Sequence, residues 1–378
     1  MRMRLWGLIA LMAGVMLFWV VRRVVPSGMR GIPVQRNSDL VESVVRLIRA
    51  NYVDEPDAVR TMAGGFRGLV NSLDALSSYL EPDAVRKLND PRYTSFKDVG
   101  LILFKRSPAF PVVVDVIAGS PAEKAGFQAG DVISALDDRS TLLQGLGEMR
   151  LALKDAEARP VKVRFIRRNA TKDVQLTRAD LYPQSYSFAE EPGTAGILTV
   201  RHFYPPLVDE IRKAVVPRLA RSAGPLILDL RYAHEGDNGE TRRFLNLFVR
   251  SDKAGWFEKK GGAKDILSCP DKADLESLSV ILWIDAATMG PAEIAAAGLR
   301  DLRKSKSVGF PTAGLTAEQT LFRLEGGAAL FLTTGVFVSS SGEKVWDKGI
   351  VPDIRLEPGR RDKKAFLEKT RTLLPPRS

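Results

Sequence analysis

The chain has 378 residues, of which 45% are hydrophobic and 27% are charged. This composition excludes an intrinsically disordered chain, and the length leaves room for two or three domains. A single cysteine and two histidines exclude a disulfide framework and predict neither a metal site nor another cofactor. The net charge of +11 is scattered along the chain until the C-terminal tail, so we expect no nucleic-acid partner.

The N-terminus carries an apolar run from Leu5 to Val21 with arginines on both sides. Its 17 residues reach the lower limit of a bilayer span, and no small-residue cleavage site follows. We therefore expect residues 1–25 to form an uncleaved signal anchor in the membrane. Residues 26–38 contain proline and glycine and are interpreted as a linker.

Residues 39–95 are predicted to form a helical region. Apolar residues from Leu40 to Ile48 recur at intervals of three and four, which produces one apolar helix face. A second segment of this kind runs from Val59 to Leu73 and leads into the run SLDALSSYLEP.

Residues 96–182 resemble a PDZ domain, mainly through the run GSPAEKAGFQAGDVI that begins at Gly119. Ser120 and the proline after it predict the start of a short helix, and Gly126 predicts its left-handed end. The other elements expected in this domain are strands over 112–117, 132–136 and 161–166 and a helix over 142–153.

PDZ domains bind an extended peptide as an added strand and hold its terminal carboxylate with backbone N–H groups. The resemblance places the peptide-binding residues at Asp98, Val99, Gly100, Leu101 and Ile102. PDZ domains of this type prefer glycine at the first of these positions. The charge of Asp98 is therefore expected to weaken or change the binding of a carboxylate.

Residues 183–358 are predicted to form an α/β core. Its apolar runs are short and alternate with amphipathic segments, which is typical of strands that alternate with helices. The expected elements are strands over 196–200, 225–231 and 279–284, helices over 207–219 and 291–302, and a closing hairpin from Leu330.

Residues 359–378 form the basic tail. They contain seven basic residues and two acidic ones. A short charged segment at a chain end is usually solvated, so we expect this tail to be frayed.

Several of these runs are similar to runs in the C-terminal processing (tail-specific) serine peptidases. They are SLDALSSYLEP at 72–82, LILDLR at 226–231 and KGIVPD at 348–353. With the PDZ segment, the resemblance covers roughly residues 40–354 and implies an α/β multidomain fold: a helical segment, a PDZ domain and a peptidase-like core. Members of this family work outside the cytoplasm, so the resemblance implies that the bulk of the chain is exported.

The catalytic positions of that family are altered in this chain. In the family run Ser-Ala-Ser-Ala-Ser-Glu-Ile, the nucleophile is the second of the three serines. Here the run is TMGPAEI, which places Gly290 at the nucleophile position. The lysine base lies 25 residues further on in the family, and here that residue is Leu315. The oxyanion positions hold Pro291, which has no N–H, and Glu235, which is expected to place a negative charge near the oxyanion. Gln319 matches the third catalytic-site residue of the family.

We therefore expect a membrane-anchored, exported pseudo-peptidase that binds polypeptide C-termini or partner proteins without cleaving them. The alternative is an active serine- or threonine-type peptidase with substitute residues, for which Thr288 and His234 are the candidates. A third hypothesis is an assembly module with a silent groove. His202 is expected to pack at a strand end, and residues 339–341 are expected to form a hairpin turn.

Overall fold

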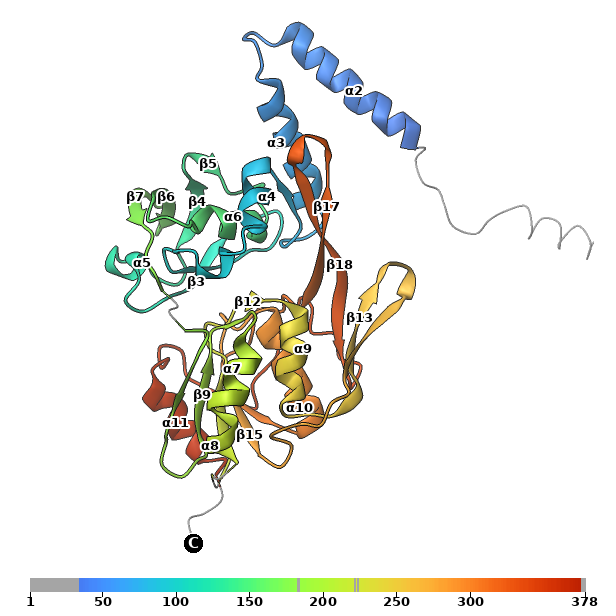
Figure 1. Cartoon of the computed structure of the whole chain (residues 1–378). Coiled ribbons are helices and arrows are strands. Elements are labelled where there is room, and N and C mark those ends of the chain that lie inside the picture. Colours follow the sequence, from blue (N-terminus) through green and yellow to red (C-terminus); the bar gives the residue numbers. More distant parts are fainter. Residues whose placement is uncertain (1–33, 182–183, 221, 223, 375–378) are drawn as a thin grey trace, which may run out of the picture. The chain divides into compact units, whose positions relative to one another are not determined.

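A computed structural model describes residues 34–181, 184–220, 222 and 224–374 (Figure 1). The expected signal anchor and the first part of the linker lie outside the described residues. Of the helices in the described part, none combines the length and the apolar character that a membrane crossing requires. The chain divides into two compact units, Met1–Thr61 and Met62–Ser378.

The first unit contains α2 (Val34–Asn51) and the start of α3 (Ala58–Asn71). Both helices agree with the predicted helical segments. The linker prediction is wrong for residues 34–38, which are helical. The run Val-Gln-Arg-Asn-Ser after Pro33 contains neither proline nor glycine, so nothing in it stops the helix from extending back to that proline.

The second unit begins with the PDZ fold. Its sheet has the strand order β2-β3-β4-β6-β7, with β2 at the edge. Ser120 caps the short helix by accepting a hydrogen bond from the backbone N–H of Glu123 at 3.1 Å, as predicted. The elements are β2 (Leu101–Phe104), β3 (Val112–Val116), α5 (Pro121–Lys124), β4 (Val132–Leu136), β5 (Arg139–Ser140), α6 (Leu146–Leu153), β6 (Pro160–Arg167) and β7 (Ala170–Thr177).

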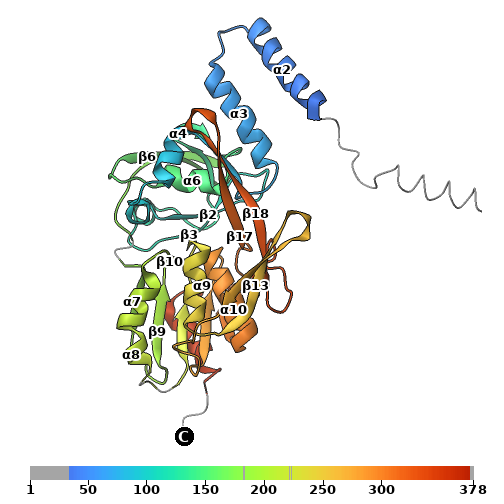
Figure 2. The same cartoon turned by 45° about the vertical axis from the view of Figure 1, so that its right-hand side comes forward.

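The peptidase-like core is built on a second sheet of order β19-β16-β15-β11-β9-β8, parallel except for β8. Alternate residues of β11 face opposite sides: Leu226 and Leu228 pack in the apolar cluster that contains α10, and Ile227 packs with Phe366 of α11. Helices α9 and α10 lie side by side (Figure 2). The elements are β8 (Tyr186–Ala189), β9 (Gly196–Val200), α7 (Leu207–Ala214), α8 (Val216–Leu219), β11 (Leu226–Asp229), α9 (Asn238–Asn246), β15 (Val280–Ile284), α10 (Pro291–Arg303), β16 (Lys306–Gly309), β19 (Ile354–Arg355) and α11 (Lys363–Arg371).

A third sheet is organised by one long strand, β18 (Ala329–Ser339). Its first residues pair with β1 (Ser78–Leu80), its last residues pair with β13 (Ser251–Lys259), and β17 (Ala317–Arg323) follows it along most of its length (Figure 2). The outer strand is β14 (Lys264–Cys269). Since β1 belongs to the SLDALSSYLEP run, this pairing brings that run to the peptidase-like core.

Two predicted helices have different limits in the structure. The helix expected over 207–219 is divided at Val215, because Pro217 cannot donate the hydrogen bond that would continue it. The helix expected over 142–153 begins only at Leu146. The buried ammonium of Lys105 binds the carbonyls of Thr141, Leu142 and Gln144 at 2.6–3.2 Å, and these carbonyls are then held in a loop.

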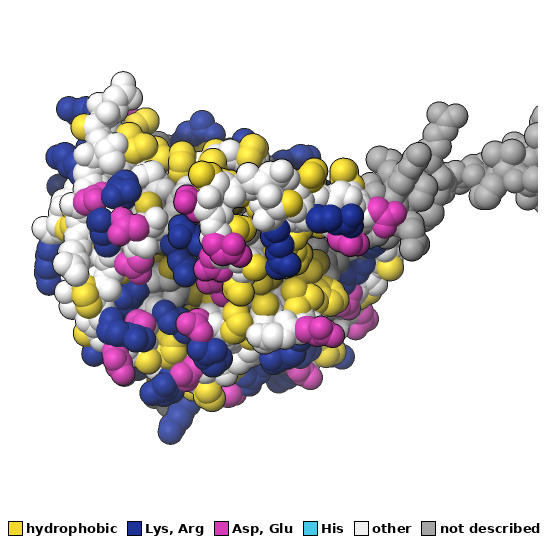
Figure 3. Space-filling view, turned by 90° about the horizontal axis from the view of Figure 1, so that it is seen from above, with side chains coloured by type: hydrophobic (Ala, Val, Ile, Leu, Met, Phe, Trp, Pro, Cys, Tyr) yellow, Lys and Arg dark blue, Asp and Glu magenta, His cyan; other side chains and the backbone are white. Residues whose placement is uncertain are grey.

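Charged side chains of both signs are interspersed on the surface. Figure 3 shows basic and acidic side chains next to one another around exposed hydrophobic side chains on the face seen from above. Exposed side chains form ion pairs, such as that of Arg164 with Asp173 at 2.7 Å. Pairs of this kind contribute little to stability, on the order of 0–1 kcal/mol.

The expected frayed tail is instead partly a docked helix, α11. Asp362 caps its N-terminus by accepting from the backbone N–H of Ala365 at 2.9 Å. Phe366 is 1% exposed and packs on Trp283, whose Nε1 donates to Thr370 at 2.8 Å. The basic residues mask this pattern in the sequence, because Lys363 and Lys364 lie on the exposed side of the same helix.

We expect Phe366→Ala to lower the free energy of unfolding by about 3–5 kcal/mol, because it leaves a cavity against Trp283. Lys364→Ala on the exposed side of α11 is the control, and its effect should stay within about 0.5 kcal/mol. Chemical denaturation of both variants measures the difference. Equal stability of the two variants would show that α11 is not part of the core.

Candidate functional site

The family nucleophile and base positions lie next to each other. Gly290 is the N-cap of α10, directly after the loop that leaves β15, and has a left-handed φ of 53°. A side-chain Cβ built on Gly290 would be 3.5 Å from the carbonyl oxygen of Leu315. Gly290 is therefore adjacent to the backbone of Leu315, but the two residues carry no hydroxyl and no amine.

A buried carboxylate holds this geometry. Glu293, in the first turn of α10, accepts hydrogen bonds from the backbone N–H groups of Gly290 at 3.0 Å, Gly314 at 2.6 Å and Leu315 at 2.8 Å. It also accepts from the hydroxyl of Thr312. Burial raises the pKa of Glu293, and these four hydrogen bonds oppose that rise.

No role was predicted for Glu293, which lies in the run TMGPAEI. The signal was present, because a glutamate three residues after a helix N-cap commonly bonds back to the N-cap N–H. Its contacts with residues 312–315 have no local signal in the sequence. They fix the loop that carries the base position to the helix that carries the nucleophile position.

Leu315 is part of an apolar cluster shared with the PDZ domain. It is 6% exposed, and the same buried cluster contains Met289 of the core and Leu101 and Met149 of the PDZ domain. At the position of a family lysine, this chain therefore has a side chain that packs between the two domains.

The other altered position, Glu235, forms a buried ion pair with the PDZ domain. Glu235 and Gly236 form β12, which pairs in parallel with β10 (His202–Phe203). The carboxylate of Glu235 contacts the ammonium of Lys154, and both side chains are 8% exposed. Burial alone would raise the pKa of Glu235, but Lys154 and the neighbouring positive charges lower it to about 2. The carboxylate predicted near the oxyanion lies on the same cavity wall as Gly290, and Lys154 compensates its charge.

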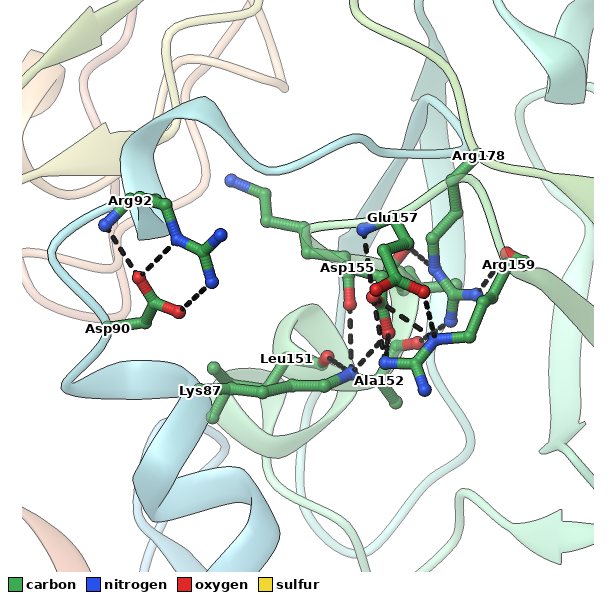
Figure 4. Close-up of polar contacts among 11 residues, drawn as sticks. Lys87, Asp90, Arg92, Leu151, Ala152, Asp155, Glu157, Arg159 and Arg178 are labelled. Atoms are coloured by element: carbon green, nitrogen blue, oxygen red, sulfur yellow. Dashed lines mark hydrogen bonds and ion pairs between the residues drawn. The ribbon is translucent and has the colours of Figure 1, made fainter.

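Further cations hold the end of α6, whose C-cap is Lys154: Lys87 contacts Leu151 and Arg178 contacts Ala152 (Figure 4). Lys87 donates to the carbonyls of Leu151 at 3.3 Å and Lys154 at 3.0 Å, and Arg178 donates to the carbonyl of Leu153 at 2.8 Å. Cations at a helix C-terminus satisfy its last carbonyls and interact favourably with the helix dipole. These hydrogen bonds fix the backbone from which the side chain of Lys154 extends.

The predicted catalytic positions line one cavity of about 280 Å³ between the two domains. Arg150 of α6 also lines it. Gln319, on β17, donates from Nε2 to the carbonyl of Leu76 at 3.0 Å and so holds the SLDALSSYLEP run. The predicted positions on its wall are Glu235, Gly290, Pro291, Leu315 and Gln319.

The substitute residues are committed to other contacts. Thr288 is fully buried, and its Oγ1 lies 2.9 Å from the carbonyl of Leu230, to which it donates. His234 lines the cavity, with Nδ1 bound to the carbonyl of Tyr232 at 2.8 Å, and burial lowers its pKa to about 4. His202 lies on the short strand β10, in agreement with a strand-end role. Residues 340–342 form the predicted turn after β18.

The peptide-binding loop of the PDZ domain contains a carboxylate of its own. Asp98 is 8% exposed, and its Oδ1 accepts from the backbone N–H groups of Val99 at 2.6 Å and Gly100 at 3.1 Å. Leu101 and Ile102 begin the edge strand β2. The predicted loop residues are thus together in the structure, and the carboxylate of Asp98 accepts hydrogen bonds from two of their N–H groups.

We expect Lys154→Met to lower the free energy of unfolding by about 3–5 kcal/mol, because it leaves Glu235 buried without a counter-ion. The double variant Lys154→Met/Glu235→Gln should recover part of this loss, since no charge is then left unpaired. Denaturant titration of the wild type, both single variants and the double variant gives the coupling energy. Additive effects would contradict a direct interaction.

The pKa of His234 predicts a pH effect. Because the folded pKa is about 4 and the ordinary value is 6.5, the unfolded chain binds a proton between these values that the native state rejects. Stability of the wild type relative to His234→Gln should therefore fall by up to about 3 kcal/mol as the pH is lowered from 7 to 4. Acids that do not interact with His234 affect both proteins equally, so the difference reports on His234 together with its coupling to Glu235. Parallel stability curves would contradict the prediction.

Comparison with known proteins agrees with this architecture. Residues 194–356 match the sequence profile of Peptidase family S41, and residues 112–167 match that of a PDZ domain. A "Probable CtpA-like serine protease" of Staphylococcus aureus (strain COL) is 23% identical over 97% of this chain and 76% of its own length. A protein of the same description from Staphylococcus haemolyticus (strain JCSC1435) is 23% identical over 84% of this chain and 64% of its own length.

A solved structure, the photosystem II D1 C-terminal processing protease, has the same fold. It superposes with a TM-score of 0.69 at 22% identity, and covers 89% of this chain and 96% of its own. The relatives match along nearly the whole chain, and the two profiles fall on the domains seen in the structure. Residues 194–356 thus form a domain of the Peptidase family S41 type beside a PDZ domain, and the chain is similar to C-terminal processing peptidases along nearly its whole length.

Proposed function

We propose that this chain is a pseudo-peptidase, a member of the family that binds polypeptide without cleaving it. The observation that carries the proposal is the pair Gly290 and Leu315, which lie side by side at the nucleophile and base positions with no reactive group on either. Peptide hydrolysis of this type needs a hydroxyl, an amine that takes its proton, and N–H donors for the oxyanion.

The oxyanion donors are altered as well. Pro291 has no N–H at the position that follows the nucleophile. Glu235 replaces a glycine at the other position, and its side chain is paired with Lys154. Loss of a single oxyanion donor typically lowers the rate about 100- to 1000-fold. These changes add to the loss of the nucleophile and the base.

The features that support binding are the PDZ domain and the cavity beside it. PDZ domains accept extended polypeptide along a sheet edge, and here β2 is the edge strand. The cavity next to α6 presents Arg150 together with apolar wall residues such as Leu76 and Phe331. The wall also contains polar side chains such as Asn238 and Gln319, so it offers hydrogen-bonding as well as apolar contacts to a peptide segment.

We further propose that residues 1–25 anchor the chain in the cytoplasmic membrane and that the described domains are exported. The uncharged run from Leu5 to Val21 supports the anchor. Family members work outside the cytoplasm, which supports the orientation. The partners would then be polypeptides on the outer side of that membrane.

The alternative, an active peptidase with substitute residues, is disfavoured by Thr288. Its side chain is fully buried and donates to a backbone carbonyl, so a substrate cannot reach it without rearrangement of the β15–α10 loop. The low pKa of His234 makes this imidazole a weak base.

We expect the full-length chain to bind disordered polypeptides without cutting them. The measurement is incubation with a mixture of unfolded proteins, followed by mass spectrometry for new termini and fluorescence polarisation for binding. Thr288→Val and His234→Gln are the matched variants. Cleavage that either variant abolishes would overturn the proposal, whereas cleavage unaffected by both indicates a contaminating protease. The absence of both binding and cleavage would favour an assembly module.

A further inference from the structure

The loop that would hold a peptide carboxylate in this PDZ domain already holds one. The two consecutive N–H groups of Val99 and Gly100 point to the same oxygen of Asp98, at 2.6 and 3.1 Å. Consecutive backbone N–H groups of this kind form anion-binding sites. The side chain of Asp98 therefore takes the place of a ligand carboxylate.

The other side of the loop is fixed. The carbonyl of Val99 accepts from Ala122 N at 2.9 Å, and the carbonyl of Gly100 accepts from Ile117 N at 2.9 Å. Gly100 has φ = +89°, and a Cβ on it would be 2.3 Å from the Cβ of Ser120. Rotation of the loop to expose its N–H groups elsewhere would break these contacts.

The electrostatic environment also opposes a second carboxylate. Burial raises the pKa of Asp98, and the charge of Lys154 and the two N–H bonds counteract this rise. Lys154 is in direct contact with Glu235 and already compensates that charge. A ligand carboxylate would displace Asp98 from its donors and leave it buried without hydrogen-bond partners, which is costly.

We propose that Asp98 determines the ligand class of this PDZ domain: internal extended segments of polypeptide rather than free C-termini. The inference rests on the proposed function, since it assumes that the PDZ groove binds polypeptide. The edge of β2 is buried in this structure, with Ile102 1% exposed, so a segment pairs with it only after the covering residues move. Such pairing uses the backbone alone and needs no carboxylate site. A free C-terminus gains nothing in this loop.

The test compares three pools of fluorescein-labelled decapeptides whose last three positions are randomised among apolar residues. One pool has free carboxylates, one has carboxamides, and in one the same decapeptides are followed by a Gly-Ser extension. Binding to the full-length wild type, Asp98→Gly and Asp98→Asn is measured by fluorescence polarisation. Asn is the matched control, because its carbonyl oxygen can still accept from the Val99 and Gly100 N–H groups.

We expect the wild type and Asp98→Asn to bind the three pools with similar affinity. Asp98→Gly should prefer the free acids by about tenfold or more, because its N–H groups are open. A tenfold preference of the wild type for free acids overturns the inference and needs no folded variant to be read. The inference is also overturned if Asp98→Gly shows no preference for free acids, or if Asp98→Asn gains as large a preference for free acids as Asp98→Gly.

The outcomes also separate this inference from the proposed function. Acid-selective binding by the wild type without cleavage overturns the inference and leaves the pseudo-peptidase proposal standing. Cleavage of the pools with equal use of acids and amides overturns the pseudo-peptidase proposal and supports the role of Asp98.

Discussion

The buried ion pair between Lys154 and Glu235 is the constraint on which the arrangement of the two domains depends. Both ions have left water, so the energy lost in desolvation is recovered only while the pair stays in contact. Lys154 is the C-cap of the PDZ helix α6, and Glu235 lies on the short strand β12, which borders the cavity. Separation of the domains would expose or orphan these charges. The pair therefore favours one docked position of the PDZ domain over others.

The shape of the candidate site depends on main-chain atoms rather than on the side chains at positions 290 and 315. Glu293 binds three backbone N–H groups and one hydroxyl, and these contacts are indifferent to the side chains at positions 290 and 315. Gly290 is compatible with the left-handed φ at the helix start. Reactive groups can thus be lost while the scaffold around them remains, since the scaffold is held by the main chain.

Much of this was predictable from sequence, and the failures have physical causes. The strands β9, β11 and β15 and the spacing of positions 290 and 315 are local patterns, so motif and periodicity were sufficient. The contact of Lys154 with Glu235 joins residues 81 positions apart, and neither has a sequence neighbour that indicates its partner. The same applies to Lys105, whose bonds to a loop delay the start of α6, and to Phe366, whose burial is masked by adjacent lysines.

Three departures from the family pattern have one property in common: each residue is buried and contacts another group of the chain. Asp98 binds the N–H groups of its own loop, Glu235 binds Lys154, and Leu315 packs in the cluster that joins the PDZ domain to the core. In an active enzyme, these positions must remain open to substrate. Without these internal contacts, the carboxylate of Asp98 or Glu235 would be buried and unpaired. The apolar side chain of Leu315 would face water. Internal contacts reduce both penalties, and the substitutions at positions 235 and 315 also join the PDZ domain to the core.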